Sequence, residues 1–180
     1  MTRFILVLIM SVFIAQNVYA ADNFLGVPRF KGVEPIKNAL YQANCAECHF
    51  AYFPGLLPAR SWRDLMAPKS LENHFGDNAE LDEMDRRMIT NFLVNNAADD
   101  SHYKRSIKIR RSIADGDVPV RITKVPYIKR KHSEIPDRLI RGNPKVRSLS
   151  YCLNCHTQAA SKGVFDDDTV FIKGYGEWDD

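Results

Sequence analysis

The sequence predicts a mainly α-helical protein, and three observations support this fold class. Residues 81–96 carry apolar side chains at steps of three and four, the spacing of a helix with one buried face. Shorter segments with helical spacing are ended by Pro or Gly. Residues 45–49 and 152–156 both read Cys-x-x-Cys-His, and one helical turn would bring the two thiols of each segment together.

The two Cys-x-x-Cys-His segments use all four cysteines of the chain. In this pattern the thiols attach to the two vinyl groups at one edge of a haem, and the histidine that follows binds the iron. We therefore predict two covalently bound haems c with His49 and His156 as proximal iron ligands, attached through Cys45, Cys48, Cys152 and Cys155.

The first twenty residues have the features of a secretory signal peptide. Arg3 precedes an apolar run over 4–15, and small residues at 18–20 favour cleavage after about Ala20. The run is shorter than the roughly 18–20 residues that a membrane-spanning helix needs. We expect an exported protein, soluble after cleavage, in a bacterial periplasm.

An exported chain with four cysteines can also form disulfides, and a zinc site with Cys and His ligands is a second alternative. A Cys45–Cys48 disulfide would close too short a loop to constrain the unfolded chain much. Disulfide chemistry also gives no reason for a histidine after each pair. A zinc site would leave the apolar faces of the chain without a large group to cover. Both alternatives are weaker than the haem interpretation.

Charge is unevenly distributed along a chain whose formal net charge is +3. Residues 72–85 contain six acidic side chains and no basic one, whereas residues 100–147 contain fourteen Lys or Arg against five Asp or Glu. The surface could steer a charged partner or offset haem propionates. A nucleic-acid partner is not expected for an exported haem protein.

The change of character near residue 99 divides the mature chain into two predicted haem domains, 21–99 and 100–180. In the first we expect helices at 33–44, 61–66 and 81–96, with an aromatic and aliphatic loop at 50–58 that covers either a haem face or ordinary core. The methionines of the 81–96 stripe are expected in the core. This order of helix, haem motif, loop and long helix resembles a class I cytochrome c domain.

The second domain is predicted to be irregular and mostly helical. Residues 118–125 are expected to be a strand or simply extended, and Pro126 to open a helix that reaches Ile135. Ser148 or Ser150 is a candidate N-cap for the turn with the second motif, and Gly163 is expected to end that turn. The tail after residue 166 carries no clear pattern.

For the first haem the distal ligand is predicted to be His74, which lies 25 residues after His49 and just before the long helix. A class I domain places its distal-ligand loop there. Met66 is the rival, because a thioether is the commoner distal ligand in that fold.

For the second haem we predict His132, which lies 24 residues before His156 on the expected helix. Ile128 and Ile135 could face the same haem. His102 is a weaker candidate, because it follows an acidic loop and no apolar stripe surrounds it. Two imidazole ligands should give lower potentials than an imidazole and a thioether.

The chain also resembles the dihaem cytochrome c (DHC) family of small periplasmic proteins with two histidines on each iron. The resemblance rests on the second haem motif and on residues 49–52, 54–62, 74–81, 96–99, 121–123 and 131–135. It implies distal ligands at His74 and His132. It also implies two partners: a small oxygen-binding c-type cytochrome as electron acceptor, and a membrane cytochrome b.

These observations favour an electron carrier rather than an enzyme, because six ligands on each iron leave no open position for a substrate. One alternative is the electron-transfer subunit of a periplasmic reductase, of the nitrate reductase small-subunit type, although that subunit lacks a class I-like first half. A dihaem peroxidase needs an accessible iron, and this chain is short for its two domains. A haem-based sensor would need a signalling domain, and none is visible.

Overall fold

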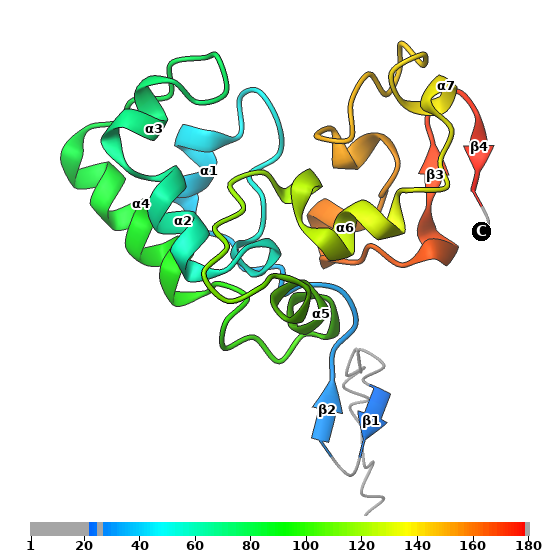
Figure 1. The fold of residues 1–180 in the computed structure, drawn as a ribbon, viewed down its shortest axis with the longest axis horizontal. Coiled ribbons are helices and arrows are strands. Elements are labelled where there is room, and N and C mark those ends of the chain that lie inside the picture. Colours follow the sequence, from blue (N-terminus) through cyan, green and yellow to red (C-terminus); the bar gives the residue numbers. More distant parts are fainter. Residues whose placement is uncertain (1–21, 25–26, 179–180) are drawn as a thin grey trace, which may run out of the picture.

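The computed structural model describes residues 22–24 and 27–178, so the predicted signal peptide lies outside the described residues. Figure 1 shows two groups of elements, helices α1–α4 on one side and α6, α7 and a small hairpin on the other, with α5 below and between them. The mainly α-helical fold class is confirmed, because helices dominate the described residues and strands are few and short.

The first group contains α1 (Ala39–Cys45), α2 (Ala59–Leu65), α3 (Pro68–Glu72) and α4 (Glu83–Asn95), with a 3-10 turn at Pro54–Leu56. The long helix predicted at 81–96 is therefore present as α4. Asp82 caps it by accepting a hydrogen bond from the Met84 backbone N–H at 2.9 Å, and Glu83 and Asp85 occupy its first turn. Negative charge there is favoured by the helix dipole.

Two details of the first group differ from the prediction. Helix α1 begins at Ala39 rather than at residue 33, because the Asn38 side chain accepts a hydrogen bond from the Tyr41 backbone N–H at 2.9 Å and caps the helix there. Met84 and Met88 were expected in the core, but they are 67% and 47% exposed. They lie about 100–140° around α4 from the fully buried Ile89, so they fall outside its buried face.

The second group is built from short pieces, most of which the sequence pattern did not reveal. Helices α5 (Lys104–Ser112), α6 (Pro126–Lys131), α7 (Asp137–Ile140) and α8 (Ala159–Lys162) are joined by 3-10 turns at Ile122–Lys124, Cys152–Asn154 and Asp167–Thr169. The tail forms an antiparallel hairpin of β3 (Phe171–Ile172) and β4 (Gly176–Glu177). A second two-stranded pair, β1 (Asp22–Phe24) and β2 (Val27–Arg29), precedes the helices.

Of the two alternatives for 118–125, no strand forms; residues 118–121 lie outside any helix or strand with an extended backbone at Arg121, and residues 122–124 form a 3-10 turn. The helix at Pro126 is present but ends at Lys131, with His132 as its C-cap, so Ile135 lies outside it. Neither Ser148 nor Ser150 caps the 152–154 turn, whose N-cap position is Tyr151. Gly163 was expected to end the turn with the second motif; it ends a helix in a left-handed conformation, but that helix is α8, which is separate from the 3-10 turn at Cys152–Asn154.

The main hydrophobic core crosses the predicted domain boundary at residue 99. It contains Leu56, Leu57, Ile89 and Leu93 from the first half, and also buried residues of the second half, namely Ile109, Ile113, Val125, Tyr127, Ala159 and Phe165. A smaller cluster of Leu139, Ile140, Val146 and Ile172 lies at the far end of the second half. The division into 21–99 and 100–180 stays a prediction.

The two halves are also joined through backbone contacts at Gly163. The Val33 backbone N–H donates to the Gly163 carbonyl oxygen at 2.9 Å. A Cβ atom at Gly163 would lie 2.1 Å from the Val33 carbonyl oxygen, so only glycine fits at this left-handed position. No helix among the described residues combines the length and apolarity needed to cross a membrane.

Candidate haem sites

The first site is the cavity into which the first Cys-x-x-Cys-His segment projects. Its lining includes Cys45, Cys48 and His49 from that segment and His74 from the turn after α3. Apolar side chains from α2, α3 and α4 complete the wall, among them Trp62, Leu65, Met66, Leu71 and Leu93. Cys45 is the last residue of α1, so the helix end sets the position of the first thiol.

Two histidine rings face each other across the first site. The ring centroids of His49 and His74 lie 6.5 Å apart. The Nδ1 atom of His49 is 2.9 Å from the Phe50 carbonyl oxygen, which favours an Nδ1–H donor and leaves Nε2 as the free acceptor. The backbones of His74 and Asp77 form a β-bridge that holds the second histidine in its turn.

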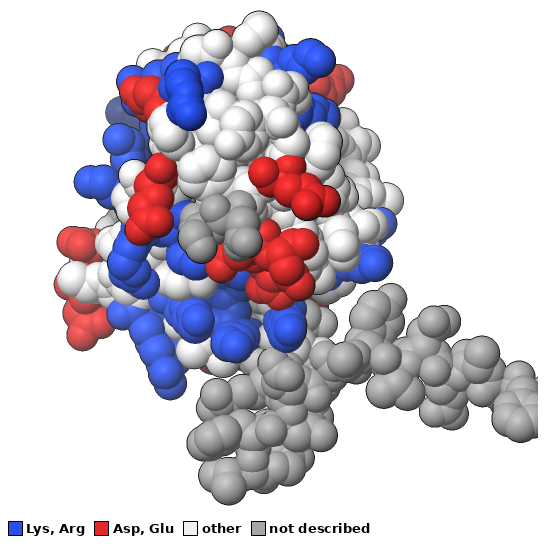
Figure 2. Space-filling model, turned by 90° about the vertical axis from the view of Figure 1, so that its right-hand side faces the viewer, with Lys and Arg blue, Asp and Glu red and all other residues white. Residues whose placement is uncertain are grey.

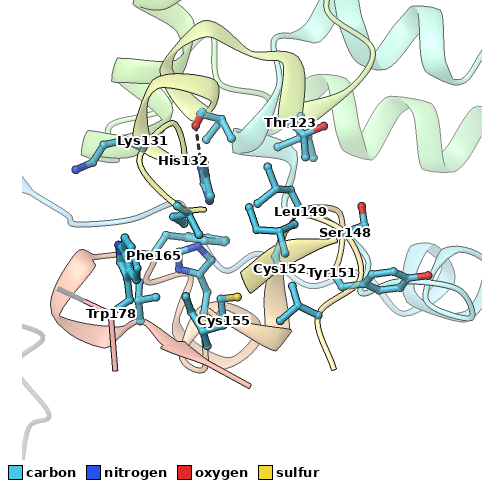
Figure 3. A pocket seen from close by; sticks show the side chains of 18 of the residues that line it. Thr123, Lys131, His132, Ser148, Leu149, Tyr151, Cys152, Cys155, Phe165 and Trp178 are labelled. Carbon is cyan, nitrogen blue, oxygen red and sulfur yellow. Dashed lines mark hydrogen bonds between the residues drawn. The ribbon is translucent and has the colours of Figure 1, made fainter. Parts of the chain in front are cut away.

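The second site also combines a Cys-x-x-Cys-His segment with an opposed histidine, but other elements supply them. Its lining includes Cys152, Cys155 and His156 from the second motif and His132 from the end of α6. Figure 3 shows His132 projecting toward the segment with Cys152 and Cys155, while Leu149 lies on one side of the cavity and Phe165 and Trp178 on the other.

The histidine rings of the second site are also held from opposite sides. The centroids of His132 and His156 lie 5.9 Å apart. Nδ1 of His132 is 2.8 Å from the Ile128 carbonyl oxygen one turn earlier on α6. The backbone of the motif is paired with the C-terminal strand, because His156 forms a bridge with Val170 and the Phe171 N–H donates to the Cys155 carbonyl.

The two cavities share a wall. Ile122 and Thr123, from the 3-10 turn that follows residue 121, line both of them. Leu56 lines the second cavity and its neighbour Leu57 lines the first. The Tyr52 ring stacks on His49 with centroids 4.4 Å apart, and its hydroxyl donates to the Ser150 carbonyl at 2.5 Å. The loop at 50–58 contributes Phe53, Leu56 and Leu57 to the main core and also lines both cavities, so its core packing is confirmed and its cover of a haem face stays a prediction.

The donor atoms and their surroundings fit haem. A transition metal between two opposed imidazoles lies about 2 Å from each nitrogen, which puts the ring centroids about 6–6.5 Å apart. Both histidine pairs are close to this spacing. Nδ1 of His74 and of His156 is buried without a hydrogen-bond partner among the described residues, so these rings are not held by polar contacts of their own.

The positions of the thiols fit covalent attachment. The four cysteines form no disulfide with one another, so each thiol can attach to a haem. Burial raises the pKa of the Cys45 thiol to about 11 and that of Cys152 to about 12. Burial is also the largest cause that lowers the pKa of His156, to about 4, followed by nearby His132 and Arg105. That histidine is therefore neutral at pH 7, as an iron ligand must be.

The weaker ligand candidates have different positions. Met66 is buried and lines the first cavity, so the structure keeps it near His74. His102 is exposed and lies outside the linings of both cavities. Sequence reasoning placed Tyr52 in the loop at 50–58 but missed its hydrogen bond to Ser150, and it missed Arg105 altogether; both reach these sites through contacts between distant segments. No local signal in the sequence could have indicated them.

Two cavities of this kind, each with a Cys-x-x-Cys-His segment and an opposed histidine, define the class of proteins that carry two c-type haems. Known proteins agree. The family model for dihaem cytochrome c matches residues 41–165. A crystal structure of a dihaem cytochrome c from Shewanella baltica OS155 is 44% identical, with a TM-score of 0.64, over 79% of this chain and 98% of that one.

Two structures from Rhodobacter sphaeroides are also similar. One is described as a dihaem cytochrome c, with 43% identity and a TM-score of 0.63 over 74% of this chain and 99% of that one. The other, described as DHC, has 40% identity and a TM-score of 0.57 over 72% and 98%. No curated protein matches the chain.

This chain belongs to the dihaem cytochrome c family and carries two covalently bound c-type haems.

Proposed function

We propose that this protein is a periplasmic electron carrier in which the imidazoles of His49 and His74 bind the first haem iron and those of His132 and His156 bind the second. The observation that carries the proposal is the shared wall of the two cavities at Ile122 and Thr123. It makes the two sites neighbours. A haem iron supplies a one-electron couple when bound.

The residues around each site favour electron transfer without a reaction of a substrate at the iron. Opposed histidines would fill both axial positions and leave no place for a substrate. Apolar side chains surround the rings and limit the access of water, which tunes the potential of such a site. The Tyr52–Ser150 hydrogen bond and the shared wall hold the two sites in fixed relation.

The ligand assignment is tested by spectroscopy of the oxidised protein. We expect low-spin signals from both haems and no near-infrared charge-transfer band between methionine and iron. Such a band would favour Met66 over His74. His132→Ala should convert one haem from low to high spin, and His74→Ala the other. His102→Ala is the matched control and should change nothing. A low-spin spectrum retained at both haems after His132→Ala would contradict the second assignment.

The carrier function is tested by adding carbon monoxide to the reduced protein. If both irons have six ligands from the chain and the haem, the spectrum should stay unchanged over the time of mixing. Rapid binding at either haem would instead favour a peroxidase or a sensor. Reconstitution with the large subunit of a periplasmic reductase tests the alternative of a subunit of the nitrate reductase type.

For partners, we propose that the protein donates electrons to a small oxygen-binding c-type cytochrome and is linked to a membrane cytochrome b. The family resemblance supports this proposal. A mixture of the reduced protein with the oxidised small cytochrome in a stopped-flow instrument should show second-order transfer that slows as salt is added. Location is tested by cell fractionation, in which the mature chain should start near Ala21 and appear in the periplasmic fraction.

A further inference from the structure

Arg105 is an unusual cation, because it lies on the first turn of α5 and its side chain is only 11% exposed. Its Nη2 donates to Asp166 Oδ1 at 2.7 Å, and its Nη1 donates to the Tyr127 hydroxyl at 2.9 Å. The same side chain lines the second cavity together with His132 and His156. These contacts fix the guanidinium plane at the edge of the second site.

One donor of this fixed guanidinium has no acceptor. Arg105 Nε is buried and has no hydrogen-bond partner among the described residues. Buried donors are nearly always paired in folded proteins, and a donor on a charged group is the most costly to leave unpaired. The arrangement therefore indicates an acceptor that the described polypeptide does not supply.

The charge around Arg105 favours an anionic acceptor. Lys31, Lys104, Lys108 and Lys131 line a groove next to Arg105, and only Asp166, Asp167 and Asp168 oppose them there. The pKa of Lys108 is lowered, first by burial and then by the neighbouring Lys104, Arg105 and Lys131. On the face of the molecule drawn in Figure 2, basic side chains gather in the lower part and patches of acidic side chains lie above them.

A haem brings two propionate carboxylates into its cavity. We propose that Arg105 binds a propionate of the second haem through its Nε–H edge, while Tyr127 and Asp166 hold the guanidinium in place. A planar guanidinium suits this task, because one edge can bind a carboxylate while the other donors keep their partners. The proposal rests on the proposed ligation of the second haem by His132 and His156.

Resonance Raman spectroscopy of the purified, haem-loaded protein tests this role, because the bending band of a haem propionate responds to its hydrogen bonds. The variants are Arg105→Gln and Arg105→Lys, with Arg110→Gln as the matched control. Arg110 lies on the same helix but is exposed. In Arg105→Gln one propionate band should shift and the others should stay. Arg105→Lys keeps the positive charge but lacks the planar donor group of the guanidinium, and it should shift the same propionate band by less. Arg110→Gln should match the unmodified protein.

The midpoint potentials give a second readout, measured by spectroelectrochemistry at pH 8, where the propionates are ionised. Loss of a cation beside one haem should lower the potential of that haem in Arg105→Gln and leave the other unchanged. If the Raman bands and both potentials are unaltered in Arg105→Gln and Arg105→Lys, the acceptor is a water molecule and the proposal is wrong. If Arg105→Gln does not load haem, Arg105→Lys decides by its Raman band.

The Arg105 proposal can fail while the ligand assignment holds. If the Arg105 variants keep low-spin spectra at both haems and unchanged propionate bands, only the proposed role of Arg105 is wrong. Failure of the ligation proposal appears instead in His132→Ala, which would keep two low-spin haems.

Discussion

The two haem sites use the same five-residue motif, but the surrounding chain supports them differently. Around the first site, α2 and α4 pack through Trp62, Ile89 and Leu93, which belong to the large core. Around the second site, Leu56 and Phe165 of the large core form part of the wall, and a separate cluster of four buried residues among those described forms the rest, namely Leu139, Ile140, Val146 and Ile172. The comparison teaches that the first cavity lies among the packed helices of the large core, whereas the second lies between that core and a small separate cluster.

The two sites also differ in which of their histidines has its Nδ1 atom beside a backbone carbonyl. In the first site the histidine of the motif, His49, has its Nδ1 beside a backbone carbonyl, and His74 does not. In the second site the order is reversed, because His132 of α6 has the carbonyl contact and His156 of the motif does not. The sites are therefore differently built, and a duplication of one site does not describe them.

The largest effect should follow from loss of the second haem. We expect Cys152→Ser with Cys155→Ser to leave residues 137–178 open to proteolysis, because four buried side chains cannot maintain that region without the haem. Limited proteolysis with mass spectrometry measures this. Cys45→Ser with Cys48→Ser is the matched control and should leave α4 protected. Equal protection of residues 137–178 in both variants would contradict the comparison.

The junction between the halves should be the next most sensitive place. Gly163→Ala should lower the free energy of unfolding by about 2–5 kcal/mol, since the new Cβ meets the Val33 carbonyl at a left-handed position. Gly116 is the matched control, because it is also left-handed (φ 88°) but has open space around it. Gly116→Ala should cost about 1–2 kcal/mol. Chemical denaturation distinguishes them, and equal losses would show that Gly163 is not a junction.

Core substitutions should sharpen the contrast between the two clusters. Ile89→Ala should cost about 2–4 kcal/mol, because Ile89 is fully buried among packed helices that cannot collapse into the cavity. Ile172→Ala should cost about 2 kcal/mol, because Ile172 lies in a small cluster formed by short elements that can relax around the cavity. Unfolding curves of the two haem-loaded variants check this. A larger loss for Ile172 would reverse our view of which half carries the stability.

The smallest effect should come from a helix cap. Side chains cap α1 and α4, whereas no side-chain cap is found on α5, α6, α7 or α8. Asp82→Ala should therefore cost about 1 kcal/mol by removing the acceptor for the Met84 N–H. Asp115→Ala, at an exposed position after α5, serves as the control and should be neutral. No change in Asp82→Ala would mean that tertiary packing alone fixes the start of α4.

Local patterns explain which elements were predictable. Helix α4 was expected, because it has a long apolar stripe and acidic residues at its start. A stop at Gly163 was also expected, because glycine often ends helices, although the helix that it ends is the separate α8. Helix α5 was missed because five of its nine residues are Lys or Arg and its buried face is only Ser106 and Ile109. It packs where Gly55 leaves room, since a Cβ there would lie 2.5 Å from Ser106 Oγ. Such a fit between distant small residues has no local signal.

The sequence by itself determined the chemistry of this protein. Cys-x-x-Cys-His is a local pattern, so two haems and their attachment were predictable from ten residues, although the structure ends α1 at Cys45 and gives the second motif a 3-10 turn. It also suggested His74 and His132 by their distance along the chain. Only the tertiary structure decided that the two cavities meet at Ile122 and Thr123 and that Arg105 reaches the second one. These contacts join residues far apart in the chain, and their positions depend on packing that no single segment specifies.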